Sequence, residues 1–185
     1  MYTWDKAQGV GTYVFQFENI FYGFNNQLFK KEVYSDTIYL FESMDFKPHL
    51  VIEHGKRLIA SKVRSNSSPE YIRDNFITPI NLFEFGDYVY YEFIISLNGH
   101  GEGLSFIGSK NKNFNALVDP EKDIINDLDG GPNIWPKTIK DDNTIIGWVD
   151  ALQLKTYVAS DSFKNSTPKY PEKKKELEKL ANSLN

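Results

Sequence analysis

The stretch FITPINLFEFGDYVYYEFIIS, residues 76–96, decides the fold. It consists of two runs rich in Ile, Phe and Tyr on either side of Gly86-Asp87. Apolar runs that flank a Gly-Asp pair are typical of a β-hairpin. Aromatic and β-branched side chains also pack well on a pleated surface, which favours strands. We therefore expect an antiparallel hairpin in the middle of the chain.

Similar runs lie on both sides of this hairpin, and each is of strand length. Four of them precede it, at residues 12–26, 27–35, 36–43 and 48–55. Asn-Asn, Ser-Asp and Met-Asp-Phe-Lys-Pro separate them, and these residues favour turns. After the hairpin, NGHGEG (98–103) reads as an exposed glycine-rich turn, and strands are expected at 104–109 and 114–119. The sequence thus predicts two meanders of about four strands each.

Helix signals are confined to the middle and the end of the chain. Ser68 before Pro69 is typical of a helix start, with the serine as N-cap. Residues 135–151 read as strand, Asp-Asn turn and strand, whereas 152–163 is compatible with either a helix or a strand. The tail, 167–185, predicts an amphipathic helix, because its apolar residues recur at helical spacing. These residues are Leu177, Leu180, Ala181 and Leu184.

The three segments SDTIYLF, GDYVYYEF and DNTIIGWV share a polar turn pair followed by an apolar strand. Short meanders repeated at this interval are typical of propeller blades or of a sandwich. We therefore predict an all-β chain of four-stranded antiparallel meanders of β-propeller type, with about two and a half to three blades. The blades would occupy residues 1–166 and a C-terminal helix residues 167–185. Since a closed propeller needs at least about four blades, the chain would be part of a longer protein, pair with a second copy, or form an open stack.

Composition limits the classes of partner and chemistry. The chain has 185 residues, a net charge of -4 and no cysteine. The charge gives no electrostatic case for binding nucleic acid. The lack of cysteine excludes disulfides, thiol nucleophiles, thiolate metal sites and a lipid-anchored cysteine on this chain. No apolar run is long enough to span a bilayer, and the start, MYTWDKAQGVGTY, lacks the order of a signal peptide.

The chain resembles the C-terminal half of a bacterial six-bladed β-propeller family. The resemblance rests on DTIYLFE…HLVIEHGK, NFITPINLFEFGDYVYYEF, NDLDGGPNIWPK…DDNTIIGWVDA and SDSFKNSTPKYPEKKKELEKLANSL, and it extends from about residue 20 onward. It implies a cell-envelope protein of gut bacteria, often a lipoprotein, without an established activity. The family's upstream blades and export signal are absent from this sequence. The resemblance supplies no catalytic residues.

The densest stretch for chemistry is NDLDGGPNIWPK, residues 126–137. An EF-hand would place Gly130 at loop position 6, and Asp129 and Asp127 at positions 5 and 3. Ile125 would then occupy position 1 and Pro136 position 12, and neither side chain can bind calcium. An EF-hand is therefore excluded.

Three interpretations of this stretch remain open. Asn126, Asp127 and Asp129 could supply oxygens to an irregular calcium site or bind another ligand. Asp127 and Asp129, two residues apart, could form a catalytic pair at a distance of about 6–7 Å. The interpretation we favour is a structural turn closed by Asx hydrogen bonds and anchored by a tryptophan. Its residues are Gly130, Gly131, Pro132 and Trp135.

The histidines give two further candidates. His49 and His54 lie five apart on an expected strand, so they should face opposite sides and share no metal site. His100 and Glu102 lie in the expected glycine-rich turn and could bind a ligand, hold a metal or shuttle protons. A plain surface turn is the alternative that we favour.

No strong catalytic motif is present, so we expect a protein that is not an enzyme. The predicted function is a cell-envelope propeller segment that binds an unknown protein or glycan, without a cofactor unless calcium binds. The alternative is a glycan-active hydrolase or a carbohydrate-binding module that uses carboxylates and aromatic rings. A hydrolase requires two or more acids around one cavity. The acids considered for that role are Asp127, Asp129, Glu102 and Glu92.

Overall fold

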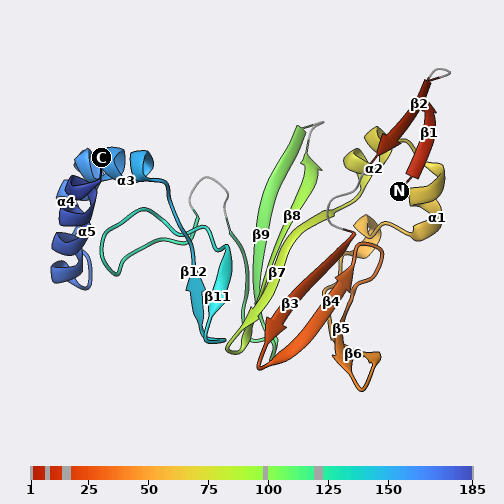
Figure 1. Cartoon of the computed structure of the whole chain (residues 1–185), viewed down its shortest axis with the longest axis horizontal. Coiled ribbons are helices and arrows are strands. Elements are labelled where there is room, and N and C mark those ends of the chain that lie inside the picture. The colour runs from red at the N-terminus through yellow and green to blue at the C-terminus, as the bar shows by residue number, and fades with distance from the viewer. Residues whose placement is uncertain (1, 7–8, 14–17, 98–99, 119–122, 185) are drawn as a thin grey trace. The chain divides into compact units, whose positions relative to one another are not determined.

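The computed structural model describes residues 2–6, 9–13, 18–97, 100–118 and 123–184 (Figure 1). The chain divides into two compact units, Met1–Leu117 and Val118–Asn185, and each is described by itself. The predicted division between residues 1–166 and 167–185 stays a prediction. None of the helices in the described ranges is both long enough and apolar enough to cross a membrane.

The first four-stranded sheet is an antiparallel meander in the order β3-β4-β5-β6. Its strands are β3 (Asn19–Phe24), β4 (Gln27–Glu32), β5 (Thr37–Glu42) and β6 (Asp45–Val51). Asn25 and Asn26 both have positive φ, as a two-residue hairpin turn of this kind requires. A register shift between Ile38 and Tyr39 marks a bulge, and Pro48 lies in the edge strand β6.

The register of this sheet places a row of apolar side chains on one face. Phe21 stands opposite Lys30, and Leu28, Phe41 and Phe46 stand opposite one another across β4, β5 and β6. Phe21, Leu28, Phe41 and Phe46 are all exposed, and we call them the outer face. The opposite face of the sheet is apolar and buried, and it carries Ile20, Tyr22, Phe29 and Ile38.

The second four-stranded sheet has the order β10-β9-β8-β7 and contains the predicted central hairpin. Its strands are β7 (Thr78–Phe85), β8 (Tyr88–Leu97), β9 (His100–Ser109) and β10 (Asn115–Val118). Gly86 has a positive φ in the turn. Val89, Tyr90 and Tyr91 are consecutive and buried, so β8 is covered on both faces. β3 lies beside β7 and thereby joins the two sheets (Figure 1).

Two sequence predictions in this unit are wrong. Residues 100–103 do not belong to a turn as expected, because β9 begins at His100 and pairs with β8 through Gly103. A glycine keeps both backbone hydrogen-bonding groups, so it continues a ladder when the partner strand is long enough. The first strand is not continuous over 12–26. A separate hairpin of β1 (Tyr2–Lys6) and β2 (Gly9–Tyr13) comes first, and β3 begins only at Asn19.

Three short helices link the two sheets. They are η1 (Gly55–Arg57), α1 (Ser61–Asn66) and α2 (Pro69–Asn75). The predicted cap is confirmed, because the Ser68 side chain accepts a hydrogen bond from the Tyr71 amide and Pro69 opens α2. Val33, Ile59 and Ile72 form a small core beneath these helices.

The second unit contains a short two-stranded ribbon followed by three helices. β11 (Thr138–Lys140) pairs with β12 (Thr144–Ile146), which confirms the predicted strand, turn and strand. Next come α3 (Ala151–Ala159), α4 (Asp161–Asn165) and α5 (Pro171–Ser183). The residues left open at 152–163 are therefore helical, apart from Ser160 between α3 and α4. Asp150 caps α3, since it accepts a hydrogen bond from the Gln153 amide.

The predicted amphipathic tail helix is α5. Ala181 is buried against Leu154, Val158 and Phe163 of α3 and α4, and Leu177 and Leu184 pack beside them. Leu180 does not join this core, because its side chain is 50% exposed. The apolar stripe of α5 is thus used mainly to hold three helices together.

The fold is mostly β, with antiparallel sheets and a C-terminal helix, which confirms the coarse prediction. The sheets are not closed within the described residues, and two four-stranded meanders and two two-stranded ribbons are observed. A closed propeller is therefore not what these residues form by themselves.

Candidate functional site

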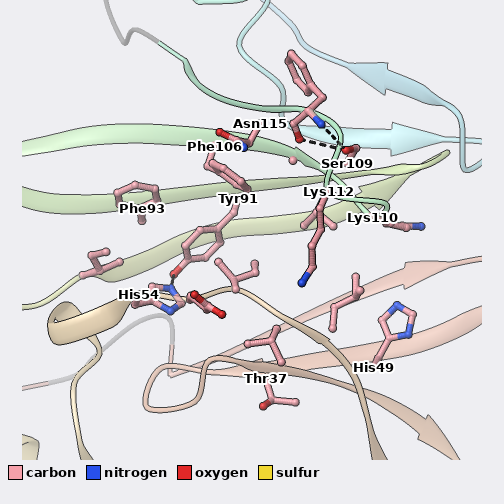
Figure 2. Close-up of a pocket in the computed structure, with 18 of the residues that line it drawn as sticks. Thr37, His49, His54, Tyr91, Phe93, Phe106, Ser109, Lys110, Lys112 and Asn115 are labelled. Atoms are coloured by element: carbon pink, nitrogen blue, oxygen red, sulfur yellow. Dashed lines mark hydrogen bonds between the residues drawn. The ribbon is translucent and has the colours of Figure 1, made fainter.

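A cavity of about 790 Å³ lies within the first unit, between the two four-stranded sheets (Figure 2). One wall is formed by β6 and the segment that follows it, through His54. The other wall comes from β8, β9 and β10 and carries Tyr91, Phe93 and Phe106. A volume of several hundred Å³ with a largely apolar lining is typical of small-molecule sites.

Glu84 of β7 lies behind one end of this cavity and is fully buried. Its Oε1 accepts a hydrogen bond from Tyr22 Oη at 2.7 Å and lies 2.9 Å from His49 Nε2. Its Oε2 lies 2.6 Å from Lys110 Nζ. Burial raises the pKa of Tyr22, and the charge of Glu84 and the hydrogen bond to it raise it further. The tyrosine therefore stays a donor, and the three groups together compensate the buried carboxylate.

A second carboxylate–histidine pair lies at the other end. His54 Nδ1 contacts Asp36 Oδ1, and His54 Nε2 lies 2.9 Å from Tyr91 Oη. Burial lowers the pKa of His54 and outweighs the opposing hydrogen bond with Asp36. The imidazole is therefore neutral at pH 7, with Nδ1–H donating to Asp36 and Nε2 accepting from Tyr91.

Lys31 is buried beside this second pair. Its Nζ donates to the carbonyl oxygens of Ser35, at 2.9 Å, and of Glu32, at 3.2 Å. The ammonium also lies 5.5 Å from the centre of the Tyr91 ring. Burial lowers the pKa of Lys31 to about 8, although the charge of Asp36 opposes the shift. A second titratable group, Lys31, therefore lies beside the His54–Asp36 pair, and its pKa is close to neutral pH.

Lys112 differs from the other lysine that lines the cavity. Lys110 is paired with Glu84 and donates to the Gly86 carbonyl at 2.9 Å. Lys112 lies in the turn after β9 with a φ of 63°, and the bond from the Phe114 amide to Ser109 Oγ closes this turn. Figure 2 shows its side chain extending from this turn towards the opposite wall. Among the described residues it forms no ion pair.

The candidate residues of 126–137 lie in the second unit. Asp129 Oδ1 accepts hydrogen bonds from Asn126 Nδ2 at 2.7 Å and from the Gly131 amide at 2.8 Å. The Asn126 side chain also accepts from the Leu128 amide. Asp127 is exposed, and its carbonyl accepts from the Lys169 amide. Two of the three candidate side chains are thus engaged in the turn, and their role in ligand or calcium binding stays a prediction.

The residues predicted to build this turn lie close to other parts of the second unit, and their structural role stays a prediction. Gly130 has a φ of 71°, and a Cβ there would lie 2.7 Å from Ser166 Oγ. A Cβ on Gly131 would lie 2.9 Å from the Leu177 side chain. Pro132 accepts a hydrogen bond from Asn126 Nδ2 through its carbonyl. Trp135 is half-buried, with Lys137 Nζ 5.4 Å from its ring centre.

His100 and Glu102 are brought to one face of β9, because they lie two residues apart on the strand. Both are exposed. Within the described ranges no group of three or more His, Asp or Glu side chains is placed to hold a metal ion. Binding at these two residues stays a prediction.

The prediction that His49 and His54 lie on one strand and face opposite sides is wrong. β6 ends at Val51, so His54 follows the strand, and both histidines line the same cavity (Figure 2). Sequence reasoning did not identify Glu84, Asp36 and Lys112. The one signal was the glutamate of NLFEFG, since an acid at an inward-facing strand position is rarely left without partners.

Three comparisons place the chain among known proteins. The model of a family described as domain of unknown function DUF4934 matches residues 2–185. No curated protein matches. A crystal structure of a Bacteroides fragilis NCTC 9343 protein, described provisionally as exported, has a TM-score of 0.58 and 18% sequence identity. The match covers 89% of this chain but 45% of that protein, so this chain spans less than half its length. Because the family model covers nearly every residue, the chain belongs to the DUF4934 family of domains of unknown function.

Proposed function

We propose that this chain is a non-enzymatic, ligand-binding part of an exported cell-envelope protein. The observation that carries the proposal is the cavity between the two sheets, with its aromatic wall and its lysine without an ion pair among the described residues. Export is supported by the description of the similar Bacteroides fragilis protein. A lipoprotein anchor, as in the family that the sequence resembles, would lie outside this cysteine-free chain.

We further propose that the two meanders are blades of a six-bladed β-propeller. The outer face supports this proposal, because four exposed apolar side chains in one sheet face are a surface that another sheet can cover. The opposite face of the same sheet already packs towards the β7–β10 sheet in this way. A further four-stranded sheet would cover the outer face.

Light scattering of the isolated chain tests whether the outer face is available to a partner. An uncovered face of this kind should cause self-association that grows with concentration, and Phe41→Lys should abolish it. Leu152→Lys, at an exposed position of α3, is the matched control and should leave it unchanged. A wild-type chain that stays monomeric at about millimolar concentration would contradict the proposal.

The hydrolase alternative has less support at this cavity. A glycosidase needs two carboxyl groups about 5–10 Å apart, and Glu53 alone supplies a carboxylate among the described lining residues. Glu102 pairs with Ile95, three positions from Glu92 on β8. Since side chains alternate along a strand, Glu92 and Glu102 point to opposite faces of the sheet.

A thermal-shift screen of small molecules tests ligand binding. A ligand that binds the folded state raises the melting temperature. Val51 lines the cavity and is 63% exposed, so Val51→Trp should fill the space without disturbing the core. Compounds that stabilise the wild type should lose their effect in this variant and keep it in Leu152→Trp. Equal stabilisation of both variants would place the ligand site elsewhere.

A further inference from the structure

We infer that the ligand is an amphiphilic anion, whose carboxylate, sulfate or phosphate group contacts Lys112 and whose apolar body covers the neighbouring hydrophobic wall. This inference rests on the proposed function, because it names the ligand class for the same cavity. It combines two observations, one on charge and one on exposed apolar surface.

Among the described lining residues, Lys112 is the cation that remains available to a ligand. Lys110 is held by the buried Glu84, and His49 Nε2 is also taken up by that carboxylate. His54 is bonded on both ring nitrogens, to Asp36 and Tyr91. Lys112 is therefore the lining cation whose charge no described side chain offsets within ion-pair distance. A ligand anion can meet it without breaking an existing bond.

Glu53 is the one competitor for Lys112 among the described lining residues. It is exposed and follows β6 on the opposite wall, and no ion pair joins it to Lys112. It would repel an anion weakly across solvent, because screening reduces interactions between separated exposed charges. Removing its charge should therefore strengthen anion binding slightly.

The rim of the cavity exposes several apolar side chains. Val51, Phe114 and Leu117 line it, and each is largely exposed, by 63%, 49% and 66%. Deeper in, Phe93 and Phe106 continue the apolar surface. Single exposed hydrophobic residues are common, but several around one cavity indicate a surface that an apolar group covers. A simple inorganic anion would leave this surface in water, whereas an amphiphile would cover it.

Three probes with the same chain and different head groups test the inference. Octanoate, octanol and octylammonium are titrated into the isotope-labelled chain, and shifts of the Val51, Leu117 and Lys112 signals are followed by NMR. Octanoate should bind about tenfold more tightly than octanol, because its carboxylate adds one charge-assisted contact with Lys112. Octylammonium should bind most weakly.

Variants assign the effect to the head group. Lys112→Met should weaken octanoate about tenfold and leave octanol unchanged, because the apolar wall is retained. Lys62→Met, an exposed lysine of α1, is the matched control and should change neither. Glu53→Gln should strengthen octanoate slightly.

The outcomes separate the two proposals. Equal affinities for the three probes, with no effect of Lys112→Met, would overturn the anionic ligand class and leave a cavity that binds ligands. Preference for octylammonium would also overturn it. If none of the probes shifts the cavity signals, the proposed ligand-binding function itself fails.

Discussion

The two carboxylate–histidine pairs differ in which partner is buried. In the first pair Glu84 is fully buried and His49 is 29% exposed, whereas in the second His54 is 3% exposed and Asp36 31%. The buried carboxylate needs Tyr22 and Lys110 as further partners. The partly exposed Asp36 is solvated by water, and the buried imidazole stays neutral instead. A buried acid is thus stabilised by several donors, and a buried base by loss of its proton.

Glu84→Gln should have the largest effect. The amide oxygen cannot serve three donors, and it leaves the Lys110 charge without its partner in a partly buried site. Breaking a buried pair costs about 3 kcal/mol or more. Urea unfolding followed by circular dichroism would measure the loss. Glu102→Gln on exposed β9 is the control, and a loss below about 1 kcal/mol for Glu84→Gln would show that the carboxylate is not the centre of this cluster.

Lys31→Met should change how stability depends on pH. The folded pKa of about 8 lies below the ordinary 10.5, so the unfolded chain holds the proton more tightly. Stability should therefore rise between about pH 8 and pH 10, by about 2–3 kcal/mol. Unfolding curves across this range would show the rise in the wild type and a flat profile in Lys31→Met. A rise that persists in the variant would assign the titration to another group.

A limit to this pH range comes from two buried tyrosines. Burial raises the folded pKa of Tyr22 and of Tyr91. A raised pKa contributes stability below the unfolded value, near pH 10, that is lost as the pH rises above it. We therefore expect a maximum of stability near pH 10.

Asp36→Asn should have a smaller effect, because the amide oxygen still accepts from His54 Nδ1. A loss of about 1 kcal/mol is expected for exchanging a charged acceptor for a neutral one. The pKa of His54, already below its usual value through burial, should fall further without the carboxylate. NMR titration of the His54 ring measures this. An unchanged or raised pKa would contradict the direct contact.

The buried His54 should also make the wild-type protein sensitive to acid. Because its folded pKa is lowered, its contribution to stability is present above the unfolded value of about 6.5 and is lost as the pH falls below it. Acid unfolding should therefore begin earlier in the wild type than in His54→Phe, once their stabilities at pH 8 are matched by denaturant. Coincident acid transitions would exclude this role.

His49→Gln should be the mildest of these changes. Tyr22 and Lys110 still bond to Glu84, and the His49 side chain is partly exposed, so water can replace it. We expect less than about 1 kcal/mol of destabilisation by urea unfolding. A loss as large as that of Glu84→Gln would mean that the first pair depends on its histidine as much as on its carboxylate.

Local features of this fold could be predicted from the sequence, and tertiary ones could not. The hairpin at Gly86-Asp87 and the cap at Ser68 depend on neighbouring residues, so the turn chemistry was sufficient. Glu84 lies 62 residues from Tyr22 and 35 from His49, and no periodicity links them. Asp150 and Gln153 form a capping box at the start of α3. Their spacing in the sequence favours a helix over a strand at residues 152–163.

The cavity lies in another part of the chain than the residues that the sequence singled out, for a related reason. Residues 126–137 contain several turn-forming residues. Carboxylates and glycines occur together there, and the same combination is found in calcium loops and catalytic sites, so the stretch suggests a function. The side-chain hydrogen bonds of Asn126 and Asp129 remain within the turn. The cavity instead arises where two strand meanders face each other, and its residues are scattered over Thr37–Leu117. Only the packing of the sheets brings them together.

The bulge and proline at the outer edge of the first sheet have a consequence for solubility. Pro48 lacks an amide hydrogen, and the bulge between Ile38 and Tyr39 disturbs the ladder beside it. Such an edge is a poor template for strands of other molecules. The outermost strand of the other sheet, β10, has only four residues. We therefore expect both edge strands to resist the growth of fibrils, even though the outer face of the first sheet is apolar.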